Sequence, residues 1–178
     1  MVVYWKAGKI MFKIGDYIIY GFNGVCKVED IGPVALSGIE SDRLYYTLHP
    51  FGEKEGVIYT PVDNKKTLMR SVLTKEEAKQ LLDEIDSIDD LGITDEKKRE
   101  STYKEVMNKC DSREWVRIIK TLDLRKETRI AEGKKVTASD EKYLRLAEEN
   151  LFSELSVSLG IPKEHMEEYI AEYITQKN

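Results

Sequence analysis

The stretch KIGDYIIYGFNGVCKVEDI, residues 13–31, decides how the first part of the chain folds. Two runs rich in apolar residues, 17–20 and 25–31, flank the dipeptide Asn23-Gly24. Their β-branched and aromatic residues suit a pleated surface. Asn-Gly favours the two-residue type I′ turn, because that turn needs a positive φ at both central positions. The stretch therefore predicts a tight β-hairpin.

Further strand patterns follow the hairpin at 44–48 and 57–60, and 67–72 can form a fifth strand. Pro61 should end the strand before it, because proline cannot donate to a strand ladder. Short strands joined by tight turns are typical of small SH3-like barrels. We therefore expect residues 11–73 to form such a β-barrel.

The apolar period changes from two residues to about 3.6 near residue 72, which predicts helices. Thr74 and Glu77 have the spacing of a capping box. The sequence also indicates where the first helix ends and where three further helices begin. Gly92 is expected to stop the first helix, and the next three are expected to begin at Thr94, Asp111 and Ser139. With a last helix after Pro162, residues 74–178 should form an all-α domain of about five helices, so the fold class is α+β.

Composition excludes several classes of protein. Among 178 residues the net charge is −5, so bulk charge does not indicate a nucleic-acid binder. Cys26 and Cys110 are the only cysteines, and no apolar run reaches the roughly 20 residues that span a bilayer. His49 and His165 are the only histidines and lack ligand partners at metal spacing. No nucleotide-binding or hydrolase motif is present, so we expect no enzyme, no cofactor and no small-molecule substrate.

A second methionine, Met11, stands directly before the strand-forming stretch. We expect residues 1–10 to be an N-terminal extension to the natural start at Met11. The alternative is that residues 1–10 add a first strand to the sheet.

Charge is distributed unevenly along the helical half. Residues 97–135 carry thirteen Lys and Arg against seven Asp and Glu, and acidic residues dominate on both sides. A basic helix face of this kind can neutralise phosphates. The other interpretation is a solvated face with acids interleaved among the bases. The candidate DNA-contacting residues are Lys97, Lys98, Arg99, Lys104, Arg113, Arg117 and Lys120.

The order of these motifs resembles a known family. Three segments carry the likeness: Lys13-Ile14-Gly15-Asp16, Asn23-Gly24-Val25 and Ile58-Tyr59-Thr60-Pro61-Val62. Together with Tyr103-Lys104 in the helical half, they resemble the CarD/CdnL-like bacterial transcription regulators. The N-terminal part is also similar to the polymerase-interacting domain of the transcription-repair coupling factor. The resemblance extends from Met11 to about Gly160.

The resemblance implies a mechanism. A Tudor-like barrel docks on the β subunit of RNA polymerase by strand-to-strand contact, and the helical domain touches promoter DNA at the upstream edge of the melted region. The complex then holds the promoter open. The docking strand carried over to this chain consists of Ile58, Tyr59, Thr60 and Pro61. Replacing Thr60 by proline should then remove a backbone donor from that strand.

One position departs from the family pattern. Many members carry a tryptophan four residues before the Tyr-Lys pair, where it acts as a wedge in the minor groove. This chain has Arg99 at that place, and its Trp115 lies too far along the sequence to take the role. Arg99 could instead contact a narrow groove or a phosphate.

Two alternatives to a DNA-contacting regulator remain open. In the first, the protein is a polymerase-binding adaptor whose helical domain contacts protein. In the second, it is an unrelated enzyme, for which only the abundance of acidic residues speaks. The resemblance implies a cytoplasmic protein that reaches the nucleoid through RNA polymerase.

Overall fold

The computed structural model describes residues 11–35 and 43–177. It divides into two compact units, Met1–Val72 and Leu73–Asn178, called here the N-terminal unit and the helical unit. Residues 1–10 lie outside the described residues, so the expected N-terminal extension stays a prediction. None of the helices in the described part of the chain is long and apolar enough to cross a membrane.

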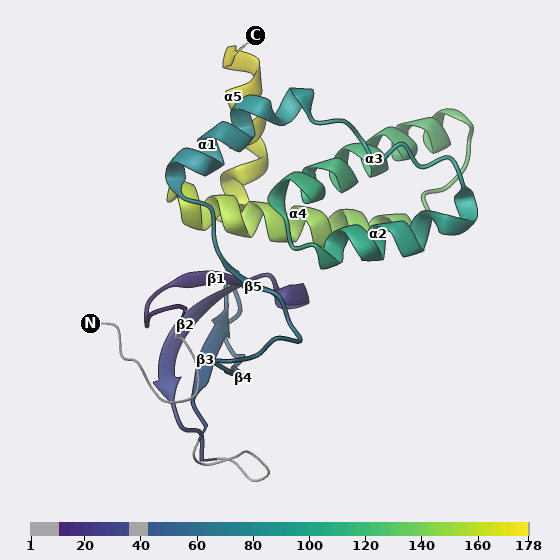
Figure 1. The fold of residues 1–178 in the computed structure, drawn as a ribbon. Helices are drawn as coiled ribbons and strands as arrows, with labels where there is room; N and C mark the ends of the chain where they lie inside the picture. Colours follow the sequence, from purple (N-terminus) through teal and green to yellow (C-terminus); the bar gives the residue numbers. More distant parts are fainter. Residues whose placement is uncertain (1–10, 36–42, 178) are drawn as a thin grey trace. The chain divides into compact units, whose positions relative to one another are not determined.

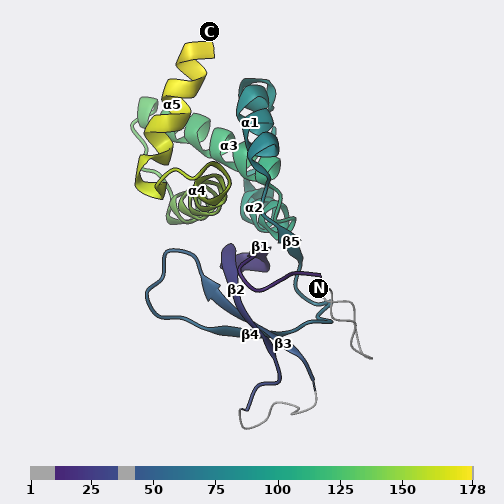
Figure 2. The ribbon, with the colours of Figure 1, turned by 90° about the vertical axis from the view of Figure 1, so that its left-hand side faces the viewer.

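The N-terminal unit is a five-stranded antiparallel sheet with the strand order β4-β3-β2-β1-β5 (Figures 1 and 2). The strands are β1 (Tyr17–Tyr20), β2 (Val25–Gly32), β3 (Tyr45–Pro50), β4 (Ile58–Pro61) and β5 (Met69–Ser71). All five expected strands are present, and Pro61 is the last residue of β4. A closed barrel needs its two edge strands to pair. In the described chain β4 pairs only with β3 and β5 only with β1, so the sheet is open and the expected barrel is not closed.

The β1–β2 hairpin is present, but its predicted two-residue turn is wrong. The register pairs Ile19 with Val25, so the connection is longer and contains a short 3₁₀ turn at Gly21–Asn23. Gly21 and Gly24 have positive φ, whereas Asn23 does not, so the backbone cannot be type I′. Gly21 has φ +49°, and a Cβ there would lie 2.7 Å from Cγ2 of Thr67. The turn therefore requires glycine at position 21.

Alternate residues of the central strands form the core of the sheet. Ile18, Cys26, Val28, Tyr46 and Leu48 are all fully buried. Phe12 packs on Tyr46 with ring centroids 5.8 Å apart. The hydroxyl of Tyr46 accepts the backbone N–H groups of Met11 at 3.0 Å and of Phe12 at 3.3 Å. The Tyr46 ring and hydroxyl thereby hold residues 11–12 on the sheet.

The helical unit contains five helices and three short 3₁₀ turns in its described part. The helices are α1 (Lys75–Glu84), α2 (Arg99–Asn108), α3 (Ser112–Ala131), α4 (Ala138–Leu159) and α5 (Met166–Lys177). The two longest, α3 and α4, pack side by side, and α2 and α5 lie against this pair (Figure 1). Trp115, Ile118 and Leu122 of α3 and Leu151 and Leu155 of α4 are fully buried between them. The α+β class and the helix count agree with the sequence prediction.

Two predicted helix starts are confirmed, because they depend on local hydrogen bonds. Thr74 and Glu77 exchange both capping-box bonds, at 2.8 and 3.2 Å. Asp111 caps α3 by accepting the N–H groups of Arg113 and Glu114.

Three other predicted boundaries are wrong. The first helix ends well before Gly92, and Asp95 rather than Thr94 caps the turn that leads into α2. Thr137 rather than Ser139 caps α4. The observed cap lies one residue after the predicted one before α2 and two residues before the predicted one at α4.

The junction between the two units falls between two adjacent residues. Val72 donates its N–H to the carbonyl of Tyr17 at 3.3 Å, which extends the β1–β5 ladder. Leu73 belongs to the helical unit: its N–H is bound by the buried Glu154 carboxylate at 2.9 Å, and its carbonyl accepts the Ser158 hydroxyl at 2.7 Å. The helical unit therefore needs Leu73, one residue before the sequence-based boundary at 74.

We expect the two units to fold separately as fragments 11–72 and 72–178. Circular dichroism should show β structure in the first and helix in the second. A helical fragment that begins at 74 keeps the residue that caps α1 but lacks Leu73, so one oxygen of the buried Glu154 carboxylate loses the N–H of Leu73 while Ser112 still binds the other. It should unfold about 1–3 kcal/mol more easily. Equal urea midpoints for the fragments that begin at 72 and 74 would contradict the role given to Leu73.

The second prediction concerns the thiol of Cys26. Burial, followed by the charge of Glu53, raises the pKa of Cys26 from 9.0 to about 12. Because the folded value is the higher one, the thiol stays protonated, and this contribution to stability disappears only as the pH rises from about 9 towards 12. In a Cys110→Ser background, native protein at pH 8 should not react with Ellman's reagent until denaturant is added. Reaction at the rate of a free thiol would contradict this placement.

Candidate functional site

The register of β4 fixes the direction of each of its backbone groups. In an antiparallel pair the N–H and C=O of one residue point to the same side, and successive residues alternate. Val62 donates its N–H to the carbonyl of Leu44 at 3.1 Å. In the same register Thr60 lies opposite Tyr46, and Ile58 lies opposite Leu48. Thr60 and Ile58 therefore direct their backbone groups to β3.

Tyr59 and Pro61 direct their backbone groups to the outer side of the sheet. Pro61 has no N–H, and its carbonyl accepts the N–H of Asn64 at 3.0 Å. Tyr59 is thus the residue of β4 that presents both a donor and an acceptor at the edge. The backbone donor that Thr60→Pro would remove points to β3, and the outward donor of the strand belongs to Tyr59.

The side chains beside this edge are apolar. Val57 is 51% exposed and Tyr59 is 40% exposed. Tyr59 lies in β4 and Val57 immediately precedes this strand, so the two exposed side chains flank the start of the strand. Thr60, on the face opposite to Tyr59, is buried, and its hydroxyl accepts the Asn64 amide at 2.8 Å. The edge therefore combines an apolar face with backbone groups that no described residue pairs with, and Thr60 and Asn64 hold its end in place.

The opposite edge of the sheet, β5, has fewer backbone groups available for pairing with a further strand. Met69 and Ser71 point outwards, because Val72 and Gly21 form the ladder bonds to the other side. The carbonyl of Ser71 already accepts a guanidinium N–H of Arg70 at 3.0 Å. A short strand whose carbonyl is occupied is a poor template for pairing. Of the two edges, β4 is the one that can accept a further strand.

The basic residues predicted to contact DNA fall into two groups. Lys97, Lys98 and Lys104 are exposed. In the described part of the chain none of them forms an ion pair. Their charges are therefore available to a partner.

Three basic residues of α3 contact the end of α1 and the segment that follows it. Lys120 donates to the carbonyls of Asp86 at 3.1 Å and Ile88 at 2.8 Å. Arg117 donates to the carbonyls of Asp89 and Asp90, and Arg113 pairs with the Glu84 carboxylate. Their spacing does place them on one face, as predicted, but that face binds residues 84–90 of the same chain.

Arg99 is also engaged within the chain. Its guanidinium donates to the Glu96 carboxylate at 2.7 Å and to the carbonyl of Ile93 at 2.9 Å. Its side chain is 16% exposed. Sequence reasoning missed the second member of this cluster, Arg125, which binds Glu96 and the buried Asp140. Only the general basic character of 97–135 could have indicated it.

The other candidates for chemistry are structural. Cys26, Cys110 and Trp115 are buried, as their patterns predicted. His49 lies in β3, where its Nε2 is 2.9 Å from the carbonyl oxygen of Glu53. Within the described residues, no group of three or more His, Cys, Asp and Glu could hold a metal ion.

Comparison with known families gives one match. Residues 12–73 match the model of the CarD-like/TRCF RID domain. The match covers the whole sheet and ends where the helical unit begins. No curated protein sequence matches the chain significantly.

Proposed function

The chain carries a CarD-like/TRCF RID domain at residues 12–73, and on that premise we propose that the protein docks on RNA polymerase through the outer edge of β4. The observation that supports this is that the backbone of Tyr59 points away from β3 and pairs with none of the described residues. An incoming strand would bind this N–H and C=O, and its side chains would pack on Val57 and Tyr59. In such β-augmentation, the main-chain bonds supply affinity and the alternate side chains supply selectivity.

The finer proposal adds the partner and the effect. The partner strand belongs to the polymerase β subunit, and the N-terminal unit is a Tudor-like module in spite of its open sheet. The helical unit contacts promoter DNA and stabilises the open complex. This protein is a bacterial cytoplasmic regulator that reaches the nucleoid with the polymerase, and it catalyses no reaction itself.

The proposed DNA contact depends on the three exposed lysines that form no ion pair among the described residues. Lys97 and Lys98 precede α2, and Lys104 lies within it. Exposed, unpaired ammonium groups neutralise phosphates without breaking bonds in the protein. Arg99, Arg113, Arg117 and Lys120 would have to give up the intramolecular contacts described above before they could do the same.

This difference supports a second candidate function. In it the helical unit contacts protein, and the whole chain is a polymerase-binding adaptor. Four of the seven predicted DNA-contacting residues are already bound within the helical unit. A protein partner needs no row of free cations, so DNA binding itself distinguishes the two functions.

The docking edge is tested by a pair of proline substitutions. Tyr59→Pro removes the outward N–H, which the sheet does not use, and proline is tolerated at such edge positions. Affinity for the polymerase β subunit should fall by about 1–3 kcal/mol, or roughly 5- to 150-fold, while the thermal midpoint changes little. Calorimetric titration and circular dichroism measure the two effects.

The matched controls separate backbone from side chain and from folding. Thr60→Pro removes a donor directed to Tyr46, so it should lower the thermal midpoint. Tyr59→Val keeps the outward N–H and should lose less affinity than Tyr59→Pro. Wild-type affinity in Tyr59→Pro would show that the outer side of β4 is not the contact.

The DNA contact is tested by its salt dependence. Three phosphate contacts give a slope of log affinity against log salt of about −2.7, and each lysine-to-alanine change at 97, 98 or 104 should reduce its magnitude by about 0.9. Fluorescence anisotropy of the full chain with a labelled duplex measures the slope. Lys120→Ala is the control and should leave the slope unchanged. Absence of binding at low salt would favour the protein-binding adaptor.

A further inference from the structure

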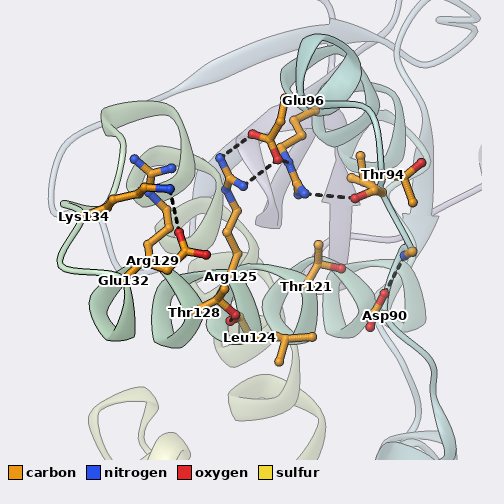
Figure 3. A pocket seen from close by; sticks show the side chains of 13 residues that line it. Asp90, Thr94, Glu96, Thr121, Leu124, Arg125, Thr128, Arg129, Glu132 and Lys134 are labelled. Carbon is orange, nitrogen blue, oxygen red and sulfur yellow. Dashed lines mark hydrogen bonds and ion pairs between the residues drawn. The ribbon is translucent and has the colours of Figure 1, made fainter.

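A cavity in the helical unit is lined by arginines that the proposed docking does not use. It is open to solvent and has a volume of about 710 Å³ between the segment 90–99 and one side of α3. Figure 3 shows Arg125 and Arg129 projecting from α3 on the side of Glu96 and Lys134, with Thr121 and Leu124 further along the helix. The volume lies within the roughly 300–1,000 Å³ typical of small-molecule sites.

The buried carboxylate of Asp140 holds Arg125 in place. The Nε of Arg125 donates to the Asp140 carboxylate at 2.9 Å, and the two side chains are 14% and 6% exposed. The remaining two nitrogens of the guanidinium donate to the Glu96 carboxylate at 2.9 and 2.8 Å. Asp140 therefore fixes a two-pronged donor that recognises carboxylate or phosphate oxygens.

Arg99 also binds the Glu96 carboxylate, and the guanidinium groups of Arg99 and Arg125 together are called the clamp here. The carbonyl of Ile93 accepts from the Arg99 guanidinium at 2.9 Å, and the hydroxyl of Tyr103 lies at 3.4 Å. Its Nε donates to Glu96 at 2.7 Å. The Glu96 carboxylate thus accepts three hydrogen bonds from two guanidinium groups, and these bonds lower its pKa.

The clamp and the Glu96 carboxylate differ in their freedom to move. Glu96 is 60% exposed, whereas Arg99 and Arg125 are 16% and 14% exposed. Glu96 can rotate into water, and the arginines stay where Asp140, Tyr103 and the Ile93 carbonyl hold them. The clamp is therefore a preformed anion site whose present occupant, the Glu96 carboxylate, can be exchanged.

Arg129 supplies a further cation in the same cavity. Its Nε donates to the carbonyl of Lys135 at 2.8 Å. No carboxylate of the described chain forms an ion pair with it. Lys134, beside it, is paired with Glu132. Arg129 can therefore pair with a second anionic group while Glu96 lies between Arg99 and Arg125.

We propose that this cavity binds a small phosphorylated molecule. One phosphate replaces the Glu96 carboxylate between Arg99 and Arg125, and a second anionic group pairs with Arg129. The exposed side chain of Leu124, 56% accessible, offers an apolar wall for the rest of the ligand. A duplex backbone is convex and needs projecting cations, whereas these two guanidinium groups are recessed, so a small ligand fits better than DNA. The site is independent of the β4 edge and of the docking proposal.

Inorganic pyrophosphate is the probe. Titrated into the full chain at constant ionic strength, it should produce saturable shifts of the arginine Nε–Hε resonances of Arg99 and Arg125. Glu96→Gln removes the negative charge that competes for the clamp and should lower the Kd at least fivefold. Arg129→Ala should raise the Kd about tenfold. Arg113→Ala, whose guanidinium pairs with Glu84 outside this cavity, should leave the Kd unchanged.

The test does not depend on removing Arg125, because that change would leave the buried Asp140 charge unpaired and can unfold the unit. The proposal is overturned if millimolar pyrophosphate gives no saturable shift, or if Glu96→Gln does not tighten binding. An effect of Arg113→Ala equal to that of Arg129→Ala would mean unspecific attraction and also overturns it. So does a duplex that shifts these resonances when pyrophosphate does not.

Discussion

The antiparallel register that places Thr60 opposite Tyr46 determines what the outer edge of the sheet can bind. Because backbone groups alternate along a strand, this one pairing directs Thr60 and Ile58 to β3. The backbone of Tyr59 points to the outer side, where no described residue pairs with it. A shift by one residue would also bury Tyr59 and expose Thr60. Burial of Thr60 and the bond from Asn64 to its hydroxyl oppose that shift. The register of β4 with β3 therefore determines both which residues are buried in the sheet and which backbone groups point outwards.

Sequence predicted the features that depend on local chemistry. The five strands followed from apolar alternation, and the caps at Thr74 and Asp111 followed from hydrogen bonds within one turn. The features that depend on distant residues were missed. Asn23-Gly24 did not form the expected turn, because the register of β1 with β2 leaves a longer connection. The end of α1 was misplaced, because Arg117 and Lys120, far along the chain, bind the carbonyls of residues 86–90.

The basic segment shows the same limit for function. Thirteen cations between 97 and 135 look like one surface in the sequence. In the structure Lys97, Lys98 and Lys104 face solvent. A second set, Arg113, Arg117 and Lys120, binds residues 84–90, and a third set lines a cavity. Which acid or carbonyl each cation meets depends on how the helices pack, and helical spacing alone does not contain that information. The direction of the Tyr59 backbone was hidden for a similar reason, since it follows from pairing with β3.

Amide hydrogen exchange read by NMR tests the central claim most directly, because it reports on single backbone N–H groups. In the free protein the amide of Tyr59 should exchange rapidly, while those of Ile58, Thr60 and Val62, which point to β3, should be protected. Adding the RNA polymerase β subunit should slow exchange at Tyr59 and leave the others protected as before. The account is contradicted if Tyr59 is already protected in the free protein. It is equally contradicted if bound polymerase leaves Tyr59 unchanged and instead protects Met69 or Ser71 on the opposite edge.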